Sequence, residues 1–178
     1  TEADEIRALS KIFEKGYLYR GLKPVNWCLD CRSALAEAEV EYEDKKSDAV
    51  DVAFPVVDTD ALRAIFNVGV KHPAYAVIWT TTPWTLPANQ AVCANPELTY
   101  DLIETEKGLL ILAHDLAEAC LTRYDMVEHK VLASCAGSQL EHLQLNHPFQ
   151  QRSVPVILGA HVTLEAGTGL VHTAPAHG

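Results

Sequence analysis

The sequence of 178 residues predicts a mainly β fold, barrel-like or sandwiched, with a few short helices. From residue 48 onward, short runs rich in Val, Ile, Thr and aromatic residues recur between turns that contain Gly, Pro and Asn. The helical segments do not alternate regularly with these runs, which argues against a parallel α/β sheet. Two regions are expected: residues 1–47, an N-terminal helix with a small C-x-x-C connecting module, and residues 48–178, a β-rich domain.

Three segments are predicted to be helical, namely residues 1–16, 58–67 and 114–124. The first begins at the N-cap Thr1 and ends at Gly16, while the second begins at Asp58 or Thr59. Strands are predicted over residues 49–57, 74–81, 98–105, 108–115, 129–137 and 153–160.

The balance of charge is acidic, with 24 Asp and Glu residues against 14 Lys and Arg residues. A domain that binds nucleic acid mainly by neutralising phosphates needs clustered cations, so affinity for RNA must have another source. The apolar runs are too short to cross a bilayer, and a soluble, cytoplasmic protein without a membrane partner is expected. Five cysteines with only one close pair favour a reducing compartment.

Cys28 and Cys31, in WCLDC, have the spacing of half a zinc ribbon. The other three cysteines lie singly in strand or helix patterns, so a second pair of ligands would have to lie outside this sequence. Two ordinary thiols without a metal are the preferred interpretation, and zinc is the alternative.

The stretch WTTTPWTLPAN, residues 79–89, places three threonines where a buried strand runs into a turn. If the backbone stays extended, Thr80 and Thr82 share one face, while Trp79 and Thr81 share the other. Each threonine carries a methyl and a hydroxyl group on a stiff side chain, so several together suit a small, rigid pocket. The structural alternative is a strand end whose threonines serve only β propensity.

His172, in EAGTGLVHTAPAHG, follows a Gly-Thr-Gly turn and a short apolar strand, and His177 lies in the same loop. The turn lacks both the dinucleotide fingerprint and the P-loop lysine, so it is not a phosphate loop. It is expected to permit a close backbone approach. A hydrogen-bonded structural histidine is the common alternative to a functional one.

Three stretches together resemble the editing domain of isoleucyl-tRNA synthetases, which is inserted into the Rossmann catalytic domain of these class I enzymes: NWCLDCRSALAEAEVEY, WTTTPWTLPANQAV and GTGLVHTAPAHG. The resemblance covers essentially the whole chain. Related valyl and leucyl enzymes carry Thr-Thr-Arg-Pro where this sequence has Thr-Thr-Thr-Pro, and the leucyl type lacks His-Thr-Ala-Pro. The HIGH-type and KMSKS-type signatures of amino-acid activation are absent from this sequence, so it is not expected to charge tRNA by itself.

The resemblance implies hydrolysis of valyl-tRNA(Ile), and of valyl-adenylate as a second route, by a pocket that excludes isoleucine. A hydrophobic pocket distinguishes the two amino acids by only about 1–3 kcal/mol, a limit for which isoleucyl-tRNA synthetase is itself the usual example. The implied catalytic residues are Thr80, Thr81 and Thr82, acting on a positioned water without a side-chain nucleophile. The implied substrate-binding residues are Trp79, Trp84, Asn89 and His172. Of these, His172 would lie against the valine side chain.

The partners that the resemblance implies are the aminoacylated 3′ end of tRNA(Ile), valine and the remainder of the synthetase chain. ATP and Mg belong to the parent catalytic domain, and no cofactor is expected within this sequence. The family has an aspartate shortly after the His-Thr-Ala-Pro loop that holds the substrate ammonium group. Because the sequence ends at Gly178, before such a residue, the chain alone is expected to fold and to be an impaired deacylase.

Two other classes of function were weighed against this one. A non-catalytic tRNA-binding module built on the C-x-x-C knuckle conflicts with the net negative charge. A free-standing small-molecule esterase conflicts with the lack of an activated nucleophile.

Overall fold

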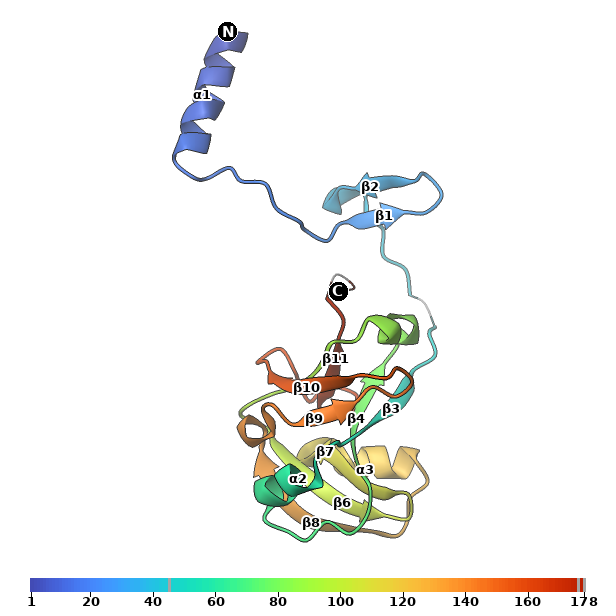
Figure 1. Ribbon diagram of the computed structural model, residues 1–178. Helices are drawn as coiled ribbons and strands as arrows, with labels where there is room; N and C mark the ends of the chain where they lie inside the picture. The colour runs from blue at the N-terminus through green and yellow to red at the C-terminus, as the bar shows by residue number, and fades with distance from the viewer. Residues whose placement is uncertain (45, 176, 178) are drawn as a thin grey trace. The chain divides into compact units, whose positions relative to one another are not determined.

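The contacts within the chain divide it into two units, residues 1–44 and residues 45–178 (Figure 1). The computed structural model describes residues 1–44, 46–175 and 177. The first unit holds a helix and a small hairpin, and the second holds both larger sheets. In the described parts of the chain, every helix is too short or too polar to traverse a lipid bilayer.

The first unit begins with α1 (Glu2–Glu14), whose side chains are all exposed. Thr1 occupies the N-cap as predicted, but its side chain makes no capping hydrogen bond; its carbonyl accepts the first hydrogen bonds of the helix, from the amides of Asp4 and Glu5 at 2.9 and 3.0 Å. Gly16 follows the helix with a φ of +77°, which agrees with the expected stop. The remaining elements are an antiparallel hairpin of β1 (Asn26–Cys28) and β2 (Ser33–Leu35), and the 3₁₀ turn η1 (Glu37–Glu39).

The second unit contains a five-stranded sheet with the strand order β3-β4-β7-β6-β8. Its strands are β3 (Val50–Pro55), β4 (Ala74–Thr80), β6 (Thr99–Thr105), β7 (Gly108–Ala113) and β8 (His129–Ala136). Only the β4–β7 pairing is parallel, and the other neighbours are antiparallel. All five strands fall within segments predicted from the sequence.

A four-stranded sheet has the order β11-β5-β10-β9. Its strands are β5 (Ala91–Ala94), β9 (Gln144–Asn146), β10 (Ser153–Leu158) and β11 (Leu170–Thr173). The sequence did not predict β5, because its four residues are all buried and show no alternation. β9 was missed because three residues are too few for a pattern.

The prediction of a mainly β fold is confirmed, and the second unit is built from two open sheets. Within the residues that the structure describes, neither sheet closes into a barrel. A large apolar cluster contains side chains of both sheets, among them Phe54, Ile78, Leu102, Leu145 and Val156. Because the same core includes both sheets, it fixes where the ends of their strands meet.

Two helices flank the sheets. α2 (Thr59–Phe66) begins at Asp58, whose carboxylate accepts from the backbone amides of Asp60 and Ala61 at 2.8 and 3.1 Å. This settles the N-cap in favour of Asp58. α3 (His114–Arg123) packs Leu121 and its neighbours against the outer face of the five-stranded sheet.

Candidate functional site

A cavity of about 250 Å³ lies where β4 and β11 end side by side. Its lining residues are Trp79, Thr80, Thr82, Thr85, Val171, His172, Ala174 and His177. Four residues singled out in the sequence therefore converge here from two different sheets: Trp79, Thr80, Thr82 and His172. The threonine-rich and histidine-containing loops form one site.

The two lining threonines are brought together by a turn. β4 ends at Thr80, and the 3₁₀ turn η2 (Pro83–Ala88) begins three residues later. The Oγ1 atoms of Thr80 and Thr82 lie 3.2 Å apart, and the backbone amide of Thr82 donates to Thr80 Oγ1 at 3.0 Å. The two side chains thus lie together, as they would on an extended strand, although β4 ends at Thr80 and Thr82 lies in the turn before Pro83.

His172 is held from both ring nitrogens. Its Nε2 lies 2.7 Å from Thr85 Oγ1, and its Nδ1 lies 3.1 Å from Asn89 Nδ2. Thr85 Oγ1 donates to the Thr82 carbonyl at 2.8 Å, so it accepts from His172. Asn89 Nδ2 also donates to the Ala91 carbonyl at 2.8 Å, so Nδ1 of His172 is the acceptor. This network assigns the neutral tautomer with the proton on Nε2.

The surroundings of His172 also favour the neutral ring. Burial lowers the pKa of His172 below 6.5, and His147 and His177 act in the same direction. A neutral imidazole with both nitrogens occupied presents an uncharged wall to the cavity. Such a wall suits contact with an aliphatic side chain.

Asn89 lies behind the cavity and is fully buried, at 0% exposure. Its side chain contacts His172 and does not belong to the cavity lining. The Oδ1 atom is buried and has no hydrogen-bond partner among the described residues. An orphaned acceptor costs about 1–3 kcal/mol, so the surrounding structure imposes this orientation.

Besides Asn89, two predicted site residues lie outside the lining. Trp84 is 72% exposed, and Thr81 contributes its carbonyl to a 3.4 Å hydrogen bond from the hydroxyl of Ser47. Their contact with a substrate stays a prediction.

Strand alternation does not predict Thr85, because this residue lies in the 3₁₀ turn beyond the end of β4. The sequence signal that could have located Thr85 is Pro83. Proline favours the start of a 3₁₀ turn, in which residue 85 donates a hydrogen bond to the carbonyl of residue 82.

The Gly-Thr-Gly turn allows the close backbone approach expected of it. Gly167 and Gly169 have φ values of +85° and +78°. A Cβ at Gly167 would lie 3.1 Å from Trp79 Cβ, and one at Gly169 would lie 2.2 Å from Ala113 Cβ. Tyr100 donates its hydroxyl to the Gly169 carbonyl at 2.7 Å, which anchors the turn to the five-stranded sheet.

The two cysteines of the C-x-x-C pair lie on or next to the β1–β2 hairpin. The backbone amide of Cys31 donates to Cys28 Sγ at 3.3 Å, and this contact lowers the pKa of the Cys28 thiol. Among the described residues, no three His, Cys, Asp or Glu side chains are grouped to hold a metal ion. The pair offers half of a tetrahedral zinc site, and zinc stays an untested alternative to two ordinary thiols.

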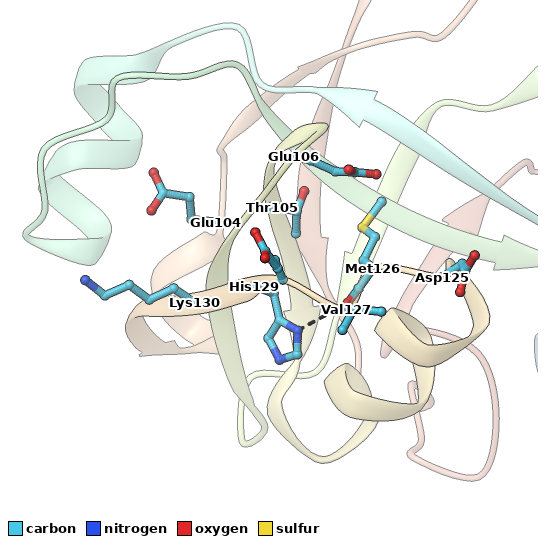
Figure 2. Close-up of a pocket in the computed structure, with 9 residues that line it drawn as sticks. Glu104, Thr105, Glu106, Asp125, Met126, Val127, His129 and Lys130 are labelled. Atoms are coloured by element: carbon cyan, nitrogen blue, oxygen red, sulfur yellow. Dashed lines mark hydrogen bonds between the residues drawn. The ribbon is translucent and has the colours of Figure 1, made fainter.

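A larger cavity, of about 580 Å³, lies between the β6–β7 turn and the connection from α3 to β8 (Figure 2). Four of its lining residues are acidic: Glu104, Glu106, Asp125 and Glu128. Carboxylates repel the phosphates of a nucleic acid, so this cavity is a poorer candidate for binding a tRNA end than the threonine cavity.

The fold resembles that of known editing domains. The GlLeuRS-CP1 crystal structure matches with a TM-score of 0.61 at 14% identity, covering 72% of this chain and 55% of that chain. The cytosolic leucyl-tRNA synthetase editing domain of P. knowlesi matches with a TM-score of 0.59 at 13% identity, covering 73% of this chain and 59% of that chain. These likenesses define the class of fold.

The family follows from the sequence. Residues 1–157 match the family model of the class I tRNA synthetases (I, L, M and V), and the chain belongs to this family. The isoleucine–tRNA ligase of Dechloromonas aromatica (strain RCB) is 66% identical over 180 residues, which cover 99% of this chain and 19% of that protein. That of Chromobacterium violaceum is 62% identical over 178 residues, covering 100% of this chain and 19% of that protein. The chain thus spans about one fifth of the length of these relatives.

Proposed function

We propose that this chain is an editing domain that hydrolyses valyl-tRNA(Ile) and excludes isoleucine. The observation that carries the proposal is the convergence of Thr80, Thr82, Thr85 and His172 on one cavity of about 250 Å³. The identity to isoleucine–tRNA ligases supports the choice of amino acid, and the likeness to editing domains supports the class of site.

The proposed reaction is hydrolysis of the ester between valine and the terminal ribose. The oxygen of a water molecule bonds to the ester carbonyl carbon, the bond from that carbon to the ribose oxygen breaks, and the ribose oxygen takes up a proton. Hydroxyl groups at Thr80 and Thr82 orient the water and the ester by hydrogen bonds. Thr81 keeps its proposed catalytic role, while Trp79 and Trp84 are proposed to contact the terminal adenosine.

His172 is proposed as the wall that rejects isoleucine. Both of its nitrogens are engaged, by Thr85 and by Asn89, so the ring has no free lone pair for general-base catalysis. Forcing one more methylene into a rigid, well-packed cavity costs about 1–3 kcal/mol. An imidazole ring that is held by hydrogen bonds at both nitrogens therefore excludes isoleucine more effectively than a mobile ring does.

The wider setting is proposed from the family. The partners are the aminoacylated 3′ end of tRNA(Ile), valine as the misacylated amino acid and the remainder of the synthetase chain, in the cytoplasm. Valyl-adenylate is a second proposed substrate of the same cavity.

The test compares hydrolysis of valyl-tRNA and isoleucyl-tRNA in a full-length synthetase that carries residues 1–178. Thr81→Ala is expected to lower the rate on valyl-tRNA, and His172→Ala is expected to raise hydrolysis of isoleucyl-tRNA. Equal hydrolysis of both substrates by the parent protein would refute the proposal.

A further inference from the structure

The carbonyl groups of the η2 turn receive donors from a distant loop. Pro83 and Pro87 have no backbone N–H groups, and the last carbonyls of such a turn lack partners within it. The Leu86 carbonyl accepts from the backbone amide of Asn89, and side chains of the loop that joins β9 to β10 donate to this carbonyl and to that of Pro87: His147, Gln150 and Arg152.

Each of these donors has a defined target. Nε2 of His147 donates to the Leu86 carbonyl at 2.8 Å, and its Nδ1 accepts from the backbone amide of Gln150 at 3.1 Å, which fixes the tautomer. Nε2 of Gln150 donates to the Pro87 carbonyl at 3.1 Å. The turn is therefore held from outside by side chains as well as by its own backbone.

Arg152 makes the contacts that lead to the site. One guanidinium nitrogen, Nη2, donates to the Pro87 carbonyl at 3.0 Å and also to the Asn89 carbonyl. Hydrogen bonds from a charged donor are about twice as strong as those between neutral groups. Arg152 thus fixes the backbone of the residue whose side chain meets His172.

The path from Arg152 to the cavity wall has two links. Arg152 binds the backbone carbonyl of Asn89, and Asn89 Nδ2 lies 3.1 Å from Nδ1 of His172. Asn89 is fully buried, so its side chain has no alternative solvent-facing position. A shift of its backbone must therefore move Nδ2 relative to the imidazole.

We propose that Arg152 is a positioning residue for amino-acid discrimination, acting through Asn89 on His172. The inference rests on the proposed function of the cavity. A purely structural Arg152 would stabilise the loop without affecting the choice between valine and isoleucine, and this difference makes the two roles separable.

The test uses Arg152→Gln in a full-length synthetase that carries this segment, with Arg63→Gln as the matched control. Arg63 is also an exposed arginine whose Nη2 donates to a backbone carbonyl, that of Val70 at 3.0 Å, and it lies on α2 and does not line the cavity. We expect Arg152→Gln to lower the valyl-to-isoleucyl ratio of kcat/KM about tenfold, the loss expected for a charged hydrogen bond. Arg63→Gln should leave that ratio unchanged.

Crystal structures of the parent protein and of both variants provide a readout that needs no activity. In Arg152→Gln, we expect the distance between Asn89 Nδ2 and His172 Nδ1 to exceed hydrogen-bond range, while Arg63→Gln keeps it. An unchanged ratio together with an unchanged distance would overturn the proposal. If the parent protein hydrolyses neither substrate, the proposed function fails, and the distance alone still decides whether Arg152 positions the ring.

Arg152→Lys is a second variant that keeps the proposal testable if Arg152→Gln does not fold. Lysine keeps the charge but lacks the planar fork of donors, so an intermediate ratio is expected. A lysine variant with a ratio below that of Arg152→Gln would contradict a role based on donated hydrogen bonds.

Discussion

The Thr85 hydroxyl lies 2.7 Å from Nε2 of His172, although 87 positions separate the two residues in the sequence. The same hydroxyl donates to the Thr82 carbonyl, so one side chain links the threonine turn to β11. This link assigns the proton on the imidazole and fixes the wall of the cavity. Thr85 is therefore the most direct place to perturb the site without touching the predicted residues.

Thr85→Val should weaken discrimination while nearly preserving the shape of the side chain. The change leaves Nε2–H of His172 without its partner, and an unsatisfied buried group costs about 1–3 kcal/mol, whereas the Thr82 carbonyl keeps its hydrogen bond from the backbone amide of residue 85. We expect a lower midpoint of thermal unfolding and a raised rate on isoleucyl-tRNA. Thr85→Ser retains the hydroxyl and serves as the control; a serine variant that loses as much discrimination as the valine variant would argue against the hydrogen bond.

Acidic pH should impair both folding and discrimination through His172. Its folded-state pKa is lowered by burial and by His147 and His177, so the unfolded chain binds the proton first as the pH falls. Folding stability therefore decreases as the pH drops from 6.5 toward the lower pKa of the folded state, and is unaffected by this group above 6.5. Protonation also makes Nδ1 a donor that faces the donor Nδ2 of Asn89.

The measurement for this prediction is the valyl-to-isoleucyl ratio across roughly pH 5 to 8, where histidines titrate. The ratio is expected to fall on the acidic side in the parent protein and to be flat in His172→Gln. Identical profiles for the two proteins would assign the effect to another group.

Gly169→Ala should destabilise the larger unit strongly. Its φ is +78°, and the added methyl would lie 2.2 Å from Ala113 Cβ, so both strain and overlap oppose the change. We expect a loss of at least about 2 kcal/mol in the free energy of unfolding. Gly69→Ala is the control, because a Cβ there meets nothing within 4 Å, and it should be nearly neutral. Equal effects of the two variants in denaturant titrations would show that the close approach is relaxed in solution.

Asp101→Asn should change the titration of His114 without changing discrimination. The buried Asp101 carboxylate accepts from Ser134 Oγ at 2.6 Å and contacts His114 Nδ1 at 2.7 Å, and this contact raises the pKa of His114 above 6.5. A raised histidine pKa stabilises the fold below the unfolded-state value, and this contribution disappears as the pH rises through the folded-state pKa. In Asp101→Asn we expect NMR titration to show a lower pKa for His114. A pKa that does not fall would mean that another group raises it.

Local patterns predicted most of the fold, and long-range contacts account for what was missed. Apolar runs bounded by turn residues located β4 and β6, and the capping carboxylate located the start of α2. The fully buried β5 showed no alternation, and β9 was too short for any pattern.

In the site, the sequence motifs identified Thr80, Thr82 and His172, because they lie in or just after apolar strands. The motifs could not identify Thr85 or Arg152, since their roles depend on partners that only tertiary folding brings near. Asn89 was among the residues that the resemblance implied, but its hydrogen bond to His172 depends on tertiary folding in the same way.

The walls of the cavity enter the chain at very different times during synthesis. The threonine side lies at the C-terminal end of β4 in one sheet and is complete by residue 85, whereas β11, which carries His172, occupies residues 170–173 of the other sheet. A ribosome-bound chain can thus finish the five-stranded sheet while β11 has not yet been translated. Under the proposed function, the chain would distinguish amino acids only after β11 docks beside β5.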